Sequence, residues 1–274
     1  WYFGLCIMRH QPGTKVRFSS ILCLHLVMLG RTGAGKSSTG NTILGRQAFS
    51  LMKSYKSVTR EIAKRATVSG RKVSVVDTPP FFETEMNPEQ LMTEIARSVY
   101  LSSPGPHAFL IVFNVNMKIT EQEQKIPQMI ETMFGEGVLK YSIILFTHGD
   151  LLRGESMEQA IEKNNALRRL VDQCDGRYHV FNNKDQNNRK QAYDLQQKSN
   201  TMIEQNGGGH YRNQMYEDMY NTAQMRNSEC ESGKNVVVVF LISNFEVSMQ
   251  QIKTLKLNTP QVLSFGAASS DILI

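Results

Sequence analysis

Residues 30–37 constrain the fold of this 274-residue chain more than any other part of its sequence. They read GRTGAGKS and match the pattern G-x-x-x-x-G-K-[ST] without a gap. The apolar run at residues 21–29 predicts a buried strand before them, and Lys36–Leu44 suits a helix that Gly45 would end. Because glycines let such a loop wrap inward, several backbone N–H groups can point at one anion. The segment therefore predicts a phosphate-binding loop between a strand and a helix.

Two side chains of this loop have predicted roles in binding a nucleotide. Lys36 would place a cation on the β- and γ-phosphates, and the Ser37 hydroxyl would bind Mg²⁺. The N-terminus of the following helix adds roughly half a positive charge at the same point. A glycine-rich turn that matches by chance is the alternative, and the predicted strand and helix on either side argue against it.

Two further residues are candidates for binding the metal. Asp77 follows the apolar residues 73–76 at the end of a predicted strand, where phosphate-loop proteins need a carboxylate to hold Mg²⁺, directly or through water. Taken alone, Asp77 could simply end a strand, but its separation from Lys36 fits one crossover plus an extra strand. Thr59 lies between them, where a switch threonine would reach Mg²⁺ or the γ-phosphate; an ordinary strand threonine is the alternative.

The phosphate loop alone does not distinguish ATP from GTP, so the base must be read elsewhere. Residues 147–150, Thr-His-Gly-Asp, follow a predicted strand. The Asp150 carboxylate can accept hydrogen bonds from both the N1–H and the exocyclic amine of guanine, a pair that adenine does not offer. We expect His148 to lay its ring over the base, with a surface histidine as the alternative. Asn182 and Asn183 follow the last predicted strand, where a loop would touch guanine from its other side, although Asn-Asn is also a turn signal.

Strands and helices alternate along the chain, which predicts an α/β fold with a mostly parallel central sheet flanked by helices on both faces. Beyond the first strand, the expected strands are residues 59–69, 72–76, 107–115, 141–147 and 178–181. The expected helices after Lys36–Leu44 are residues 88–101, 120–134, 155–174 and 195–205. Thr120 and Glu123 form a predicted capping box at the start of helix 120–134, and Pro127 is the weak point of that helix. We place one domain at residues 20–220, with extensions at residues 1–19 and 221–274.

Composition and charge exclude several other classes of protein. The net charge is +6, and no run of Lys and Arg with interleaved aromatic residues predicts a nucleic-acid groove. The 4 cysteines are scattered without a C-x-x-C pair, which argues against a disulfide framework or a zinc site and indicates a reducing compartment. The apolar runs at residues 21–29 and 236–242 fall well short of the roughly 20 residues that a membrane-spanning helix needs.

Several longer segments of the chain occur in the order expected for one known family. They are residues 30–45 (GRTGAGKSSTGNTILG), 76–79 (VDTP), 104–109 (PGPHAF), 147–150 (THGD), 177–184 (RYHVFNNK) and 206–211 (NGGGHY). Together they resemble the immunity-associated GTPases, the GIMAP family, whose G domain is of the plant avirulence-induced-gene type. The later segments are the more specific ones, because nothing in phosphate chemistry requires them. The resemblance covers about residues 20–220.

The resemblance implies a P-loop GTPase with a Ras-like G domain, GTP and GDP as ligands, and self-association of the GTP form through the switch regions. It also implies roles in lymphocyte survival or in membrane-linked cytosolic events. We expect a cytoplasmic protein and leave peripheral contact with intracellular membranes open. By position, the nucleotide contacts would be Gly30, Arg31, Thr32, Gly33, Ala34, Gly35, Lys36, Ser37, Ser38, Thr39, Thr147, His148, Gly149, Asp150, Asn182 and Asn183. Ser54 is carried over as well, because it lies in the stretch that matches the first switch. The expected Mg²⁺ ligands remain Ser37, Thr59 and Asp77.

Two residues depart from the family pattern. Pro80 replaces the glycine that usually follows Asp-Thr-Pro, and the N–H of that glycine normally bonds the γ-phosphate. Proline has no N–H to give, and one such charge-assisted bond is worth roughly 1.5–3 kcal/mol. Phe81 stands where Ras-type enzymes keep the glutamine that orients the attacking water. We therefore expect slow hydrolysis at most and assign no catalytic residue.

The sequence is compatible with three functions. The leading one is a GTP/GDP switch or GTP-dependent scaffold with slow intrinsic hydrolysis. A constitutively GDP-bound interaction module without effective GTPase activity is the first alternative, and Pro80 favours it. An ATP-using enzyme with the same phosphate loop is the second, and both Asp150 and the absence of a second basic lid motif argue against it.

Overall fold

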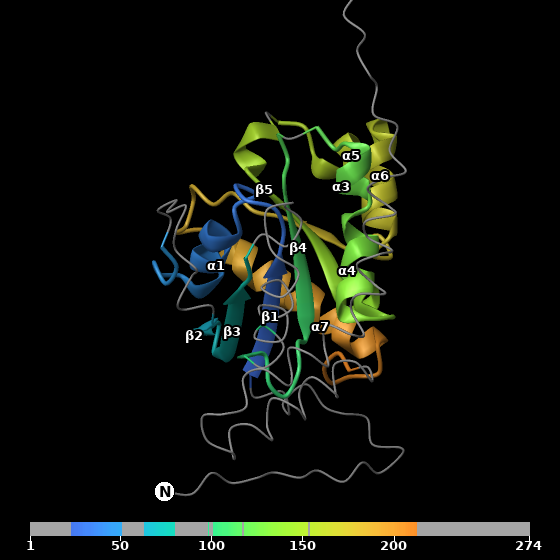
Figure 1. Cartoon of the computed structure of the whole chain (residues 1–274). Helices are drawn as coiled ribbons and strands as arrows, with labels where there is room; N and C mark the ends of the chain where they lie inside the picture. The colour runs from blue at the N-terminus through green and yellow to red at the C-terminus, as the bar shows by residue number, and fades with distance from the viewer. Residues whose placement is uncertain are drawn as a thin grey trace, which may run out of the picture.

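The computed structural model describes residues 23–50, 63–79, 98, 101–116, 118–152 and 154–212. A 6-stranded sheet of order β2-β3-β1-β4-β5-β6 lies at its centre (Figure 1). Its strands are β1 (Cys23–Leu29), β2 (Ala63–Val68), β3 (Arg71–Asp77), β4 (Ala108–Asn114), β5 (Ser142–Thr147) and β6 (Tyr178–Val180). Neighbouring strands run parallel except for the antiparallel pair β2 and β3. The mostly parallel sheet predicted from the sequence is confirmed.

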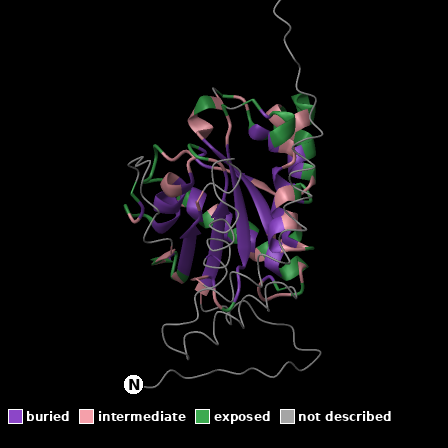
Figure 2. Ribbon diagram, in the orientation of Figure 1, coloured by how far each residue is buried: buried purple, intermediate pink, exposed green. Residues whose placement is uncertain are grey.

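The central strands β1, β4 and β5 are apolar along nearly their whole length, because helices cover both faces of the sheet. The edge strand β2 differs, since Lys64 and Arg65 are charged and Val68 is the one fully buried residue in it. Figure 2 shows this contrast between the buried middle of the sheet and its partly exposed edge. Charged side chains on an edge strand discourage pairing with strands of other molecules.

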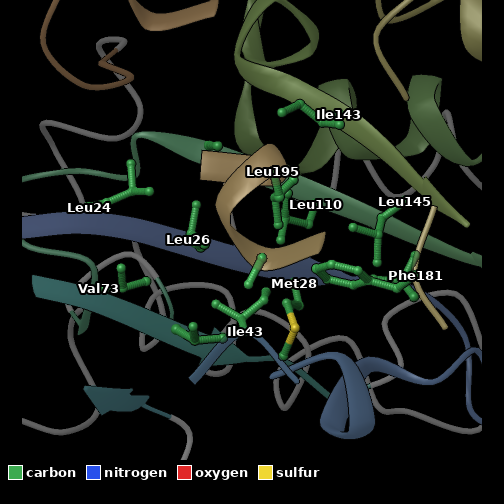
Figure 3. Packing of buried hydrophobic residues seen from close by; sticks show 14 of the residues in the cluster. Leu24, Leu26, Met28, Ile43, Val73, Leu110, Ile143, Leu145, Phe181 and Leu195 are labelled. Atoms are coloured by element: carbon green, nitrogen blue, oxygen red, sulfur yellow. The ribbon is translucent and has the colours of Figure 1, made fainter. Parts of the chain in front are cut away.

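Helices cover the sheet in two groups. They are α1 (Lys36–Leu44), α3 (Glu121–Gln124), α4 (Ile126–Phe134), α5 (Met157–Lys163), α6 (Asn165–Asp172) and α7 (Arg189–Gln205), with 3₁₀ turns η2 (Val138–Tyr141) and η3 (Gly149–Leu152). On one face, Ile43 of α1 and Leu195 of α7 belong to a cluster with Leu26, Met28 and Leu110 (Figure 3). On the other face, α4 and α6 form a second cluster with the alternate residues of β1. Within the part of the chain that is described, no helix is both long and apolar enough to cross a lipid bilayer.

The prediction of a single helix at residues 155–174 is wrong, because the structure has two helices there, α5 and α6. Asn164 separates them with an extended backbone, φ −123° and ψ 104°. Its side chain accepts hydrogen bonds from the N–H groups of Ala166 and Leu167 at 2.9 and 3.3 Å, so it caps α6. Apolar residues continue on both sides of Asn164, which is why the sequence suggested one helix.

Among the described residues, the other expected elements are found with shifted ends. The predicted helix at residues 120–134 is present as α3 and α4, which meet at Lys125, and the predicted capping box is confirmed. Pro127 lies in the first turn of α4, where a backbone N–H has no partner inside the helix. Helix α7 begins at Arg189, ahead of the predicted start at residue 195. Of the predicted helix at residues 88–101 only residues 98 and 101 are described, and the proposed extensions at 1–19 and 221–274 lie outside the described residues.

Candidate functional site

Those residues singled out in the sequence that the structure describes gather at one edge of the sheet. The phosphate loop follows β1, Asp77 ends β3, Thr147 ends β5, and Asn182 lies just beyond β6. Because these strands run in the same direction, their carboxyl ends meet at the same edge. Open α/β sheets bind their ligands at this edge. The structure therefore brings the described residues among the predicted phosphate, metal and base contacts to one side of the molecule.

The phosphate loop is folded around the amine of Lys36. Lys36 Nζ donates hydrogen bonds to Gly30 O at 2.8 Å and to Arg31 O at 3.1 Å, and the residue is 8% exposed. Gly35 precedes α1 in the left-handed region, with φ 96° and no side-chain hydrogen bond to the first turn. A Cβ on Gly35 would lie 3.1 Å from Thr147 Cγ2, so a larger residue would be both strained and crowded. The start of α1 thus offers backbone N–H groups to an anion.

The remaining residues of the loop have different surroundings. Thr32 and Gly33 form its exposed rim, and Ser38 lies in the first turn of α1. Arg31 Nη1 lies 3.5 Å from Glu123 Oε1, so this guanidinium is directed toward the buried capping residue of α3. The loop is therefore connected to α3 as well as to α1.

Ser37 and Asp77 form the second part of the site. Ser37 Oγ donates a hydrogen bond of 2.6 Å to Asp77 Oδ2, and Asp77 is 6% exposed. Burial raises the pKa of Asp77, while the Ser37 hydrogen bond and the Lys36 charge lower it. Asp77 Oδ1 is buried and has no hydrogen-bond partner among the described residues, which is costly unless another group fills that position. A carboxylate and a hydroxyl are oxygen ligands of the kind that Mg²⁺ prefers, so these two residues fit the metal.

Thr147 ties the end of β5 to the phosphate loop. Its Oγ1 lies 2.8 Å from Ala34 O and 3.3 Å from Phe113 O, and the residue is fully buried. His148 has a left-handed backbone, with φ 60°, and its Nδ1 lies 3.0 Å from Thr147 Oγ1. Thr147 therefore contacts both the phosphate loop and the imidazole ring of His148.

Asp150 lies in η3, the turn directly after β5. Its Oδ2 accepts a 2.6 Å hydrogen bond from Lys184 Nζ, and this bond lowers the pKa of the Asp150 carboxyl. Asp150 Oδ1 is shielded from solvent and has no hydrogen-bond partner in the part of the chain that is described. Gly149 permits η3 to approach β6 closely, since a Cβ there would lie 2.7 Å from Val180 Cγ1. One oxygen of the ionised carboxylate is therefore left without a hydrogen-bond donor among the described residues.

The two asparagines after β6 have different partners. Asn183 Oδ1 accepts a hydrogen bond from Thr42 Oγ1 at 2.9 Å, and Asn183 Nδ2 donates to Thr39 Oγ1 at 3.2 Å. Asn182 Oδ1 accepts from the backbone N–H of Lys184 at 3.0 Å. Both polar groups of the Asn183 side chain are thus bound to α1, and Thr39, a predicted nucleotide contact, is one of their partners.

The sequence model of the AIG1 family matches residues 24–231. The chain belongs to the AIG1 family. Immune-associated nucleotide-binding protein 9 from Arabidopsis thaliana is 34% identical over 209 residues, which cover 72% of this chain and 60% of that protein. GTPase IMAP family member 8 from Mus musculus is 36% identical over 168 residues, which cover 59% of this chain and 24% of that protein. The resemblance expected from the sequence is confirmed, and the chain spans less than two thirds of the length of these relatives.

One solved structure is similar to the AIG1-family chain at a lower sequence identity. A dimerization-deficient mutant of Toc33 from Arabidopsis thaliana has a TM-score of 0.48 and 17% identity, over 60% of this chain and 72% of that one. The fold of the AIG1-family chain is assigned from its own sheet order and from the position of the phosphate loop after β1.

Sequence reasoning missed the residues that hold the loop after β6 and the end of α1 in the AIG1-family chain. Gln191 Oε1 on α7 accepts a hydrogen bond from the N–H of Asn182 at 3.0 Å. Arg189 donates to two backbone carbonyl groups at the end of α1. Lys184 forms the ion pair with Asp150. Contacts of this kind join residues far apart in the chain and leave no spacing signal; the one available clue was the position of Lys184 directly after the two asparagines.

Some residues named from the sequence lie outside the described part of the AIG1-family chain. They are Ser54, Thr59, Pro80 and Phe81. The roles of Ser54 in the first switch and of Thr59 at the metal stay predictions. The same holds for the effects expected from Pro80 and Phe81 on γ-phosphate binding and hydrolysis.

Proposed function

We propose that this chain binds GTP and GDP, together with Mg²⁺, and acts as a GTP/GDP switch or GTP-dependent scaffold with slow intrinsic hydrolysis. One observation carries the proposal: the loop around Lys36 and the carboxylate of Asp150 follow β1 and β5 at the same edge of the sheet. This arrangement supports binding of a single ligand by the phosphate loop and by a group suited to guanine. The names of the relatives, an immune-associated nucleotide-binding protein and a GTPase, support the same function.

In this proposal the phosphates lie against the N-terminus of α1. Lys36 is held by two carbonyl groups of the loop, so its charge is fixed where the β- and γ-phosphates would bind. Backbone N–H groups of the loop and of the first turn of α1 supply further donors. Ser37 and Asp77 would hold Mg²⁺, with Thr59 from the first switch, and the bound metal neutralises phosphate charge.

The guanine base would be read mainly by Asp150. The N1–H and the exocyclic amine of guanine would donate to its carboxylate, whose Oδ1 has no other partner among the described residues. His148 would lie against one face of the base, and Asn182 and Asn183 would border its other side. Adenine presents an acceptor at N1, and a shielded carboxylate left without a donor disfavours that base.

The identity of the nucleotide released from the purified protein on denaturation tests this function. Chromatography is expected to recover GDP or GTP. In a competition titration, unlabelled GDP is expected to displace labelled GDP, whereas ADP at the same concentration leaves it bound. Recovery of adenine nucleotides, or equal displacement by ADP, would contradict the proposal and favour an ATP-using enzyme.

A second candidate function is a module that holds GDP constitutively and acts only through its surface. Pro80 favours it, because the missing N–H removes a contact to the γ-phosphate, a group that GDP lacks. Parallel titrations with GDP and a non-hydrolysable GTP analogue separate the two candidates. A switch requires that both ligands bind in the same concentration range, whereas a constitutive module predicts GDP binding with negligible affinity for the analogue.

We further infer that the GTP form self-associates through its switch regions, in a cytoplasmic protein whose peripheral contact with intracellular membranes stays open. The family resemblance supports this inference. Light scattering on protein loaded with GDP and with a GTP analogue measures the mass of each form. A larger mass is expected with the analogue, and identical masses would argue against self-association. Flotation with liposomes, in both nucleotide states, tests the membrane contact.

A further inference from the structure

Lys184 and Asp150 form an ion pair between the loop after β6 and η3, the turn after β5. Lys184 Nζ lies 2.6 Å from Asp150 Oδ2, and the two side chains are 73% and 21% exposed. The lysine therefore approaches from solvent, while the carboxylate is largely covered. Of the two carboxylate oxygens, Oδ2 carries the lysine and Oδ1 has no hydrogen-bond partner among the described residues.

The backbone that carries Lys184 is fixed by contacts to two helices. Asn183, the residue before it, is bound to the hydroxyl groups of Thr39 and Thr42 on α1. The backbone N–H of Lys184 donates to Asn182 Oδ1, and Gln191 on α7 holds the N–H of Asn182. The backbone of Lys184 is thus held in place. Its ion pair therefore sets the orientation of the Asp150 carboxylate relative to α1 and the phosphate loop.

From this geometry we infer that Lys184 is a specificity-determining positioning residue, which fixes the rotation of the Asp150 carboxylate so that guanine is read by two hydrogen bonds. The inference rests on the guanine site proposed above. A carboxylate has about four acceptor positions, so Lys184 can stay on the outer side of Oδ2 while the base donates to both oxygens. Without the lysine the carboxylate can rotate, and the second hydrogen bond from the base is lost part of the time.

The prediction distinguishes guanine from hypoxanthine, which has the N1–H but lacks the exocyclic amine. Hypoxanthine needs one hydrogen bond to Asp150, so it depends less on the rotation of the carboxylate than guanine does. Loss of Lys184 should therefore weaken binding of GDP more than binding of IDP. A change that merely loosened the loop would weaken both nucleotides by the same factor.

The test measures the dissociation constants of GDP and IDP, with Mg²⁺ present, for the wild type and for Lys184→Met. GDP binding is expected to weaken by about fivefold, with a smaller change for IDP, so the preference for GDP over IDP falls. Lys184→Arg keeps the charge and is expected to restore the preference. Lys190→Met is the matched control, because Lys190 forms an exposed pair with Asp194 on α7 at the same distance of 2.6 Å.

Three outcomes would overturn the inference. Equal weakening of GDP and IDP in Lys184→Met would make Lys184 a structural residue of the loop. Unchanged or tighter GDP binding would show that the lysine does not position the carboxylate, or that it competes with the base. If the wild type binds neither nucleotide, the guanine site itself is wrong; if it binds GDP and only the Lys184→Met result disagrees, the guanine site stands and the role of Lys184 falls.

Discussion

Lys36 and Ser37 are the side chains of the phosphate loop with predicted roles in nucleotide binding. The Lys36 amine is buried against loop carbonyls, and Ser37 is bonded to Asp77, so both side chains are fixed before a ligand arrives. We predict that Lys36→Ala and Ser37→Asn each abolish nucleotide binding or weaken it by at least about 100-fold, because charge-assisted hydrogen bonds and a metal ligand are lost. Titration with fluorescent GDP measures the effect. Lys163→Ala, an exposed lysine on α5, is the control, and near-normal affinity in Lys36→Ala would refute the assignment of the phosphate site.

Asp150 is expected to decide which base is accepted. Xanthine carries a carbonyl in place of the exocyclic amine of guanine, and an amide NH₂ can donate to that carbonyl whereas a carboxylate cannot. We predict that Asp150→Asn weakens GDP binding by about tenfold or more and strengthens XDP binding. Titrations of GDP and XDP against both proteins measure the shift, with Asp194→Asn on α7 as the control. If GDP binding is unchanged and XDP gains nothing, Asp150 does not read the base.

Pro80 is expected to shift the balance between GTP and GDP. GTP loses one contact to its γ-phosphate at this position, and GDP loses none. Pro80→Gly should therefore raise the affinity for GTP relative to GDP by roughly tenfold, while hydrolysis stays slow because Phe81 remains. Dissociation constants of both nucleotides and the rate of phosphate release provide the measurement. An unchanged ratio would mean that the lost donor is irrelevant, as would happen if the N–H of Phe81 or Phe82 replaced it.

At the scale of elements, helix α1 is held by side chains from other elements. Asn183 binds its middle, and Arg189 of α7 donates to the carbonyl groups of Thr42 and Ile43 at its C-terminal end. A cation at that end also complements the helix dipole. The room for the guanidinium comes from Gly45, where a Cβ would lie 2.9 Å from Arg189 Cζ.

We predict that Arg189→Met lowers the free energy of unfolding by about 1–2 kcal/mol, because two carbonyl groups lose their charged donor. Urea unfolding of the nucleotide-free protein measures the change. Lys190→Met removes the neighbouring cation, whose partner is the exposed Asp194, and should cost markedly less. Equal losses in the two variants would show that the contact of Arg189 with α1 adds nothing to stability.

Elements were predictable from the sequence where a local signal marks them. Apolar runs indicate the buried strands, and the capping box of Thr120 and Glu123 indicates the start of α3. The break at Asn164 was not predictable, because asparagine also occurs inside helices and the apolar residues continue past it. Its helix-breaking role depends on the cap that it supplies to α6, which becomes visible only in the structure.

The candidate site was predictable to the extent that its chemistry follows a motif. The phosphate loop and Asp77 were placed from spacing and strand order, and the structure brings Ser37 and Asp77 within hydrogen-bond distance. The contacts of the loop after β6 were not predictable. Lys184 forms its ion pair with Asp150 only because β5 and β6 lie next to each other in the folded sheet. Motifs name the residues that would touch a ligand; the residues that hold them in place come from tertiary contacts.

At the scale of the whole molecule, two segments that phosphate chemistry does not require meet at the edge opposite the candidate site. Residues 104–109 and 206–211 are joined by a hydrogen bond from Tyr211 N to Pro106 O at 2.8 Å. The rings of His107 and His210 lie edge to face at 5.8 Å, and His25 of β1 stacks on His107 at 5.5 Å. These family-specific segments therefore lie together at the amino-terminal ends of the parallel strands β1 and β4.

The geometry of this histidine cluster requires neutral rings. His107 Nδ1 accepts a hydrogen bond from the backbone N–H of His25 at 3.1 Å, and His210 Nε2 accepts from Arg212 Nε at 2.7 Å. A protonated nitrogen could not accept either bond. Burial lowers the pKa of His25 and His210 to about 4 and that of His107 to about 3, and the charges of Arg65, Arg71 and Arg212 act in the same direction.

Acid is therefore expected to lower the free energy of unfolding of the domain by protonating these histidines in the unfolded chain. In the unfolded chain a histidine binds a proton below about pH 6.5, whereas the folded cluster stays neutral until about pH 4, so stability is complete above pH 6.5 and is lost as the pH falls toward 4. Between pH 7 and pH 5 the free energy of unfolding should fall by about 1–2 kcal/mol for each buried histidine.

His107→Gln keeps an acceptor for the N–H of His25 but cannot be protonated. It should lose less stability than the wild type between these two pH values, whatever its stability at pH 7, with the remaining loss due to His25, His210 and the buried His179. Urea unfolding at both pH values gives the comparison, and the same loss in both proteins would mean that His107 does not take up a proton on unfolding.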